Sequence, residues 1–117
     1  MRPFPENYEL ESFFEREPEV LDKNAPWAYN ELVFKAQAEN GTLQVKMVTG
    51  YEVMEVSWTQ GSYEVLKLDL KGVQTIRVCD EKKLDTLIAS FRNQDVDDLV
   101  LKIRPVISVT WGYDDQP

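Results

Sequence analysis

From residue 31 onward, apolar residues recur at every second position, and this alternation constrains the fold more than any other feature of the chain. It is clearest in residues 32–38 and 43–47, where each run has one apolar and one polar face. A period of two is that of a β-strand with one buried face. Between these runs, Asn40-Gly41 predicts an antiparallel hairpin with a type I′ turn, in which both central residues adopt positive φ.

Later runs repeat the pattern, at residues 54–58, 66–70, 73–78, 99–103 and 107–111. Residues 81–92 fit two interpretations. Leu84, Leu87, Ile88 and Phe91 have helical spacing, whereas Leu87, Ala89 and Phe91 also alternate as in a strand. A strand over 86–92 is the favoured interpretation, because short strands at near-regular spacing are typical of an antiparallel meander.

The first 22 residues have a different pattern and carry seven acidic residues against two arginines. Leu10, Phe13 and Phe14 recur at the spacing of one helix face, and Asn7 is a candidate N-cap. Pro18 would end the helix, because proline inside a helix removes a hydrogen bond and clashes with the preceding turn. We therefore expect an amphipathic helix over residues 8–16 that lies on the sheet.

Together these patterns predict one mainly β (α+β) domain over residues 1–117, with an acidic helical segment at 1–22 and a β-meander at 31–112. The expected architecture is an antiparallel sheet or sandwich of six to eight strands with a short N-terminal helix. A chain of 117 residues is long enough for one continuous core. The residues expected in that core are Phe34, Val45, Trp58, Leu68, Leu101, Val109 and Trp111.

Composition narrows the function. The chain has no histidine and one cysteine, so it lacks the usual groups for nucleophilic catalysis and for a Cys/His zinc site. It also has no phosphate-binding glycine loop and no dinucleotide fingerprint. The loop acids Asp95, Asp97 and Asp98 are interpreted as a solvated turn, in preference to a calcium site or a catalytic carboxylate pair. We expect no enzymatic activity, no cofactor and no metal.

The charge balance points to a class of partner. Twenty-one acidic residues against 13 basic ones give a formal net charge of −8, which disfavours binding to nucleic acid or to an anionic membrane. A basic protein is the natural partner, although acidity for solubility alone is an equal alternative. The N-terminus lacks the apolar core of a signal peptide, and the lone Cys79, expected to be a buried structural thiol, suits a reducing compartment. The predicted location is cytoplasmic.

Two groups of residues are candidates for binding that partner. Trp27 and Tyr29, in the string Ala25-Pro26-Trp27-Ala28-Tyr29-Asn30, could anchor a partner or line a ligand cleft; the alternative is that they seal the end of a β-sandwich. The second group consists of acids on the middle strands. They form either a solvated sheet face or a docking surface for a basic protein, and they are Glu52, Glu55, Glu64 and Asp69.

Three segments carry a resemblance to a known class of proteins: residues 13–18 (FFEREP), residues 26–30 (PWAYN) and residues 109–111 (VTW). In these segments the chain resembles bacterial immunity proteins encoded beside polymorphic toxins. The resemblance implies an acidic, non-enzymatic cytosolic protein that inhibits a cognate toxin domain by occlusion. Alternatives are an acidic inhibitor or adaptor of a basic nucleic-acid-binding protein and a small-ligand-binding β-domain.

Overall fold

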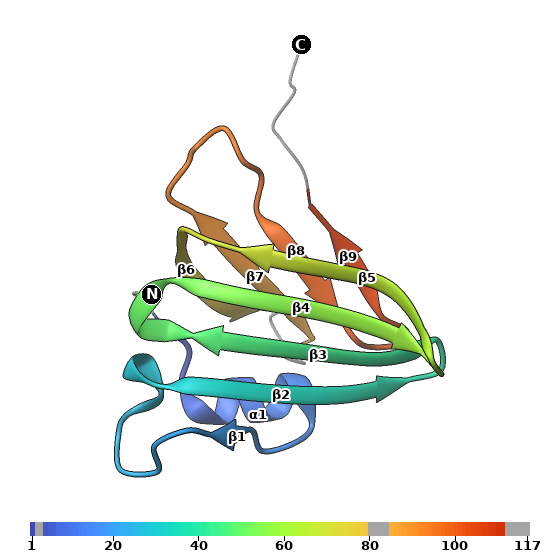
Figure 1. Ribbon diagram of the computed structural model, residues 1–117, viewed down its shortest axis with the longest axis horizontal. Helices are drawn as coiled ribbons and strands as arrows, with labels where there is room; N and C mark the ends of the chain where they lie inside the picture. Colours follow the sequence, from blue (N-terminus) through green and yellow to red (C-terminus); the bar gives the residue numbers. More distant parts are fainter. Residues whose placement is uncertain (2–3, 80–84, 112–117) are drawn as a thin grey trace.

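The computed structural model describes residues 1, 4–79 and 85–111. They form two antiparallel sheets, one α-helix and two short 3₁₀ helices (Figure 1). The five-stranded sheet has the order β1 (Glu19–Val20), β2 (Glu31–Ala38), β3 (Gly41–Val48), β4 (Val53–Gln60) and β5 (Tyr63–Leu70). The four-stranded sheet has the order β6 (Val73–Cys79), β7 (Thr86–Phe91), β8 (Leu99–Lys102) and β9 (Ser108–Thr110). The predicted mainly β, antiparallel fold with an N-terminal helix is confirmed, but the described residues form nine strands instead of six to eight. The unpredicted strand is β1, whose two residues are too few to show an alternating pattern.

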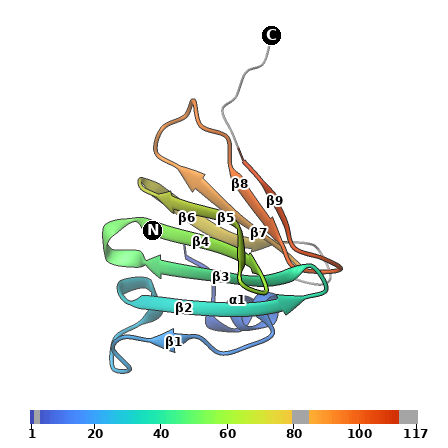
Figure 2. The ribbon, with the colours of Figure 1, turned by 45° about the vertical axis from the view of Figure 1, so that its right-hand side comes forward.

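Both sheets are meanders, because each strand pairs with the next strand along the chain. The chain passes from one sheet to the other through Lys71-Gly72, where Gly72 has a φ of 68°. The four-stranded sheet and the helix lie on the same side of the five-stranded sheet, as two views of the ribbon show (Figures 1 and 2). The helix therefore completes the cover over the part of the sheet near β2.

The ambiguous segment at 81–92 is resolved as far as it is described. Residues 86–91 form β7, which pairs with β6 on one side and β8 on the other. Ile88, for example, lies opposite Arg77 and Val100. Because β7 has a partner strand on each side, its backbone N–H and C=O groups form hydrogen bonds in the sheet. This pairing explains why the segment adopts the strand that the alternation predicts instead of a helix. Residues 81–84 of the helical interpretation lie outside the described residues.

Cys79, at the end of β6, is only half-buried, so the prediction of a buried thiol is wrong.

The predicted hairpin is present, but its turn is of another kind. β2 and β3 pair in register, with Ala38 opposite Gly41, so Glu39 and Asn40 are the central residues. Neither has a positive φ, and the type I′ prediction is therefore wrong. The positive φ, 131°, falls instead on Gly41. A Cβ there would collide with the Thr59 carbonyl oxygen, so the position requires glycine.

Helix α1 (Asn7–Phe14) places its apolar face in the core, as predicted. Phe14 stacks on Phe34 of β2 with ring centroids 4.3 Å apart. The buried residues of the helix are Leu10, Phe13 and Phe14. This packing is the main stabilisation of a helix that is too short to be stable alone.

The start of α1 differs from the prediction by one residue. Asn7 is the first helical residue, and Glu6 is the N-cap, so the prediction of Asn7 as the cap is wrong. The Glu9 carboxylate accepts a hydrogen bond from the Glu6 backbone N–H at 2.9 Å, which satisfies a group that the helix leaves unpaired. The last helical residue is Phe14, two residues before the predicted end, because the C-cap Glu15 adopts the left-handed conformation with a φ of 54°. Glu15, and not Pro18, therefore ends the helix.

The core contains three of the seven residues predicted for it in fully buried positions: Phe34, Val45 and Leu101. Trp58, Leu68 and Val109 are partly buried and pack against it. Trp111 is 42% exposed, so its predicted burial is wrong. It follows the last residue of β9 and lines an open cleft together with Leu70 of β5, so the opposite sheet covers it only in part.

Long-range hydrogen bonds tie the layers together. The Asn40 side chain donates to the Ile107 carbonyl (3.0 Å) and accepts from the Ile107 N–H (2.8 Å), which joins the β2–β3 turn to the loop before β9. Arg104 donates to the carbonyl of Phe13 at 3.0 Å and to the carboxylate of Glu15 at 2.8 Å. The end of α1 is thereby fixed to the loop between β8 and β9.

Candidate functional site

Three of the four predicted acids lie together on the outer face of β4 and β5. Glu55 and Asp69 are directly opposite each other across the two strands, and Glu64 lies opposite Thr59. Their neighbours Met54 and Val56 point the other way and are buried. Alternation along β4 and β5 thus places Glu55 and Asp69 on the outer face, and Glu64 joins that face because the register shifts between Trp58 and Thr59.

Lysines share this face, so it is mixed in charge. The Lys46 ammonium lies 2.9 Å from a Glu31 carboxylate oxygen and 3.6 Å from one of Glu55. The hydrogen bond that the Lys46 ammonium donates to Glu31 is the main reason that the pKa of Lys46 is raised. Lys67 lies opposite Ser57 on the same side. A shallow recess of about 190 Å³ lies between these strands, and its charged lining residues are Lys46, Glu55, Glu64 and Lys67.

Glu52 is separate from the acidic residues of β4 and β5. It follows the short 3₁₀ helix η2 (Thr49–Tyr51) with a φ of 57°. Both of its carboxylate oxygens accept hydrogen bonds from Arg92 Nε at 2.9 Å, and Nη2 approaches one of them at 2.7 Å. These hydrogen bonds lower the pKa of Glu52. Because Arg92 follows β7, this pair links the two sheets, and a role of Glu52 in partner binding stays a prediction.

The two predicted aromatic residues occupy different environments, although both belong to the 3₁₀ helix η1 (Trp27–Tyr29). Trp27 is partly buried and meets Phe34 edge-on, with ring centroids 5.9 Å apart. This contact fits the interpretation that Trp27 seals the end of the core. Tyr29 is 57% exposed and lies at the surface.

Sequence reasoning missed two neighbours of Tyr29. Leu21 is 76% exposed and Tyr51 is 82% exposed, and both line one cleft of about 300 Å³ together with Tyr29. We call Leu21, Tyr29 and Tyr51 the corner patch. The remaining lining residues are Asp22, Asn30, Glu31, Val48 and Gly50. The sequence gives one indication of these residues: each member of the patch is a large apolar residue in a short segment that lies outside the alternating runs.

A buried hydrogen-bond network holds the two segments beneath the corner patch. Asn30 and Thr49 are 7% and 1% exposed. The Thr49 hydroxyl accepts from the Asn30 N–H at 2.7 Å, and it also lies 2.7 Å from the Asn30 carbonyl oxygen. The Asn30 side-chain amide donates to the carbonyls of Asp22 (2.6 Å) and Ala25 (3.1 Å). Segments that carry η1 and η2 are thus fixed to each other.

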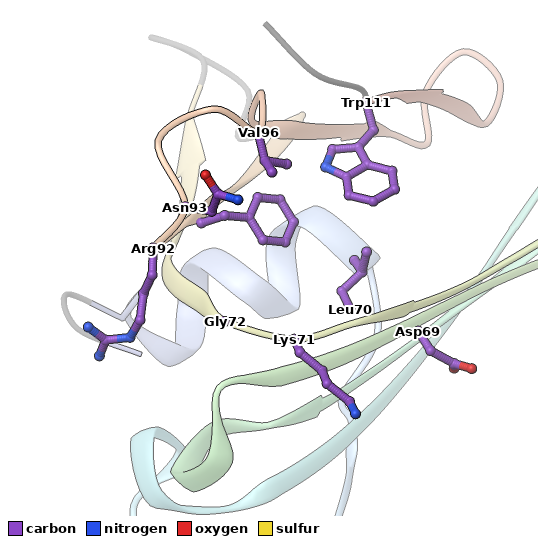
Figure 3. Close-up of a pocket in the computed structure, with 9 residues that line it drawn as sticks. Asp69, Leu70, Lys71, Gly72, Arg92, Asn93, Val96 and Trp111 are labelled. Carbon is purple, nitrogen blue, oxygen red and sulfur yellow. The ribbon is translucent and has the colours of Figure 1, made fainter.

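A second cleft, of about 390 Å³, lies where β5 leaves its sheet (Figure 3). Leu70, Val96 and Trp111 surround it, and Trp111 packs against Phe91 with ring centroids 5.7 Å apart. Two basic residues, Lys71 and Arg92, also line it. Tyr29 lines only the first cleft and Trp27 lines neither of these two, so they do not share the ligand pocket that the sequence suggested.

The acidic loop after β7 has local partners. The Asp98 carboxylate pairs with Arg77 at 3.2 Å, and the Asn93 side chain accepts from the Asp95 N–H at 2.9 Å. Within residues 1, 4–79 and 85–111, no group of three or more Asp, Glu or Cys side chains is placed to hold a metal ion. No helix in the same part of the chain is long and apolar enough to cross a membrane.

These features define a small antiparallel β protein with two sheets and a covering helix, whose surface clefts include one at the corner patch and one where β5 leaves its sheet. No family model matches the sequence, and a search of curated proteins finds no significant match. A search of solved structures finds a similar fold in the contact-dependent growth inhibition toxin–immunity protein complex from Klebsiella pneumoniae 342. The TM-score is 0.77 at 19% sequence identity, over 93% of this chain and 94% of that chain. The neighbour thus comes from a complex of the class that the three sequence segments resemble.

Proposed function

We propose that this chain is a non-enzymatic immunity protein that neutralises a toxin domain in the cytosol by covering its working surface. The observation that carries the proposal is the likeness of fold to one chain of a toxin–immunity complex over nearly the full length of both chains. The resemblance of three sequence segments to immunity proteins supports the same conclusion independently of the fold.

The composition supports the immunity side of such a complex over the toxin side. An immunity protein needs only a complementary surface, whereas a toxin that acts as an enzyme needs a catalytic set. The chain has no histidine to serve as a base, and its formal net charge of −8 opposes binding to a phosphate backbone. The same charge favours association with a basic toxin domain, because complementary charge accelerates encounter.

Growth protection tests the proposal. The toxin-like domain encoded immediately upstream of this gene would be induced in a heterologous bacterial host, with and without this chain. We expect growth arrest without the chain and normal growth with it. The matched control is a toxin domain from an unrelated system, against which the chain should give no protection.

The proposal is wrong if no toxin gene adjoins this one, or if the adjoining toxin arrests growth equally in the presence of the folded chain. Protection without a stable complex between the purified proteins would also contradict it, because occlusion requires binding.

A further inference from the structure

We propose that the corner patch of Leu21, Tyr29 and Tyr51 is the anchor of the toxin interface. Its cleft would receive an apolar side chain of the toxin that is flanked by lysine or arginine. This inference rests on the proposed function and specifies where the surface that covers the toxin lies.

Exposed apolar side chains are grouped at the corner patch. Tyr8 on α1 and Tyr63 at the start of β5 are also large and exposed, but they line none of the clefts described above. Scattered residues of that kind are ordinary on a protein surface. The three members of the corner patch instead line one cleft, although they come from three different segments. Exposed apolar groups gathered in this way mark binding sites, and tyrosine is enriched among residues that dominate binding energy.

Hydrogen bonds hold the backbone beneath the corner patch in place. Tyr29 lies next to Asn30, and Tyr51 belongs to η2, which begins at Thr49. The Asn30 and Thr49 side chains join these segments through the buried hydrogen bonds described above. The segments before β2 and after β3 also lie at the same end of the five-stranded sheet in both views (Figures 1 and 2). Because the backbone beneath the patch is already ordered, a partner loses little free energy in ordering it.

The charge at the corner patch suits a basic partner. Its cleft is lined by two carboxylates, Asp22 and Glu31, and by no lysine or arginine. Because Glu31 pairs with Lys46 at 2.9 Å, the negative charge that a partner meets there is mainly that of Asp22. The cleft in Figure 3 is lined instead by Lys71, Asp69 and Arg92, and Arg92 pairs with Glu52. A lysine or arginine of the toxin is therefore better matched at the corner patch.

Alanine substitutions at the patch test the inference. The variants Tyr29→Ala and Tyr51→Ala would be compared with Tyr8→Ala and Tyr63→Ala, which remove equally large exposed side chains elsewhere. Binding to the purified toxin domain encoded upstream would be measured by surface plasmon resonance. A hot-spot truncation weakens binding by roughly 30-fold or more, so we expect that loss for the patch variants. The control variants should stay within about twofold of the unchanged chain.

A conservative variant isolates the charge. Asp22→Asn keeps an oxygen that can accept the Asn24 backbone N–H, a hydrogen bond of 2.9 Å, and removes the negative charge. It should slow association by a few-fold and leave dissociation nearly unchanged. Hydrogen exchange of the unchanged chain gives a readout that needs no variant. Toxin binding should protect amides in residues 21–31 and 48–52.

The outcomes separate this inference from the proposed function. If the unchanged chain neither binds the toxin nor protects against it, the proposed function fails. If it binds, but the patch variants bind as tightly as the controls, or protection from exchange lies elsewhere, the anchor is wrong and the function stands. Thermal unfolding of each variant shows whether a loss of binding follows from a loss of folding, in which case the exchange pattern decides.

Discussion

Replacing Asn40 with alanine should destabilise the whole protein, although the residue lies in a hairpin turn and is not fully buried. Its side chain makes two hydrogen bonds to Ile107, at 2.8 Å and 3.0 Å, from a position 67 residues away in the chain. Each such bond contributes about 0.5–1.5 kcal/mol, so the pair accounts for about 1–3 kcal/mol of the free energy of unfolding. The loss should reach the upper end if water does not replace the side chain.

Urea unfolding followed by tryptophan fluorescence measures this loss. The midpoint should fall while the slope m stays the same, because the surface exposed on unfolding does not change. Asn93→Ala is the matched control, since Asn93 makes only a local, exposed hydrogen bond to Asp95 among the interactions described above. That control should cost at most about 0.5 kcal/mol.

A third variant, Asn40→Asp, tests the direction of the two hydrogen bonds. The new carboxylate keeps an acceptor for the Ile107 N–H but points a second oxygen at the Ile107 carbonyl. Its protonated form can donate to that carbonyl, so its pKa should be raised in the folded state. Stability relative to the unchanged chain should therefore recover as pH falls toward about 4. If Asn40→Ala costs no more than Asn93→Ala, the tie between the turn and the second sheet is not energetically significant and the reasoning fails.

Three further predictions concern the core, pH and association. Leu101→Ala should lower the free energy of unfolding by about 2–5 kcal/mol, and Leu68→Ala should lower it less because Leu68 is only partly buried. Urea unfolding that ranks the two losses in reverse would contradict the assigned core. The lowered pKa of Glu52 stabilises the folded protein at pH values above the ordinary carboxyl pKa of 4.5, and this contribution is lost as pH falls through the lowered pKa. Glu52→Gln should therefore flatten the acid side of the curve of unfolding free energy against pH. An unchanged curve would refute this. Glu55→Lys with Glu64→Lys should slow toxin association and reduce its dependence on salt between about 0.1 M and about 1 M, as measured by stopped flow; an unchanged association rate would show that these carboxylates do not guide the encounter.

The sequence predicted the strands well because each strand has one face in the core. The same alternation placed Phe34, Val45 and Leu101 correctly inside. Trp111 was misplaced because alternation indicates which side of a sheet a residue faces, and does not indicate how far the opposite sheet extends. The turn at Asn40 was assigned the wrong type because Asn-Gly at a hairpin fits more than one register, and pairing of the whole strands decides between them.

The candidate site was predicted less well, because it depends on contacts between distant residues. Glu52 was grouped with the acids of β4 and β5, but it pairs with Arg92, 40 residues along the chain. Trp27 and Tyr29 were treated as one unit, whereas only Trp27 reaches the core. Tyr51 approaches Tyr29 because Thr49 bonds to Asn30, and no local pattern indicates that two short segments 19 residues apart share a buried hydrogen bond.

The meander order of both sheets has a consequence for how fast the protein folds and unfolds. Within each sheet, every strand pairs with its neighbour along the chain, so hairpins can form at a small cost in loop entropy. The ties between layers close much longer loops, of 67 residues for Asn40 and Ile107 and 91 residues for Phe13 and Arg104. Contacts of that separation are expected to form after the main barrier, so Asn40→Ala should speed unfolding and leave the folding rate nearly unchanged in stopped-flow measurements. The few long-range hydrogen bonds would then set how long each folded molecule lasts.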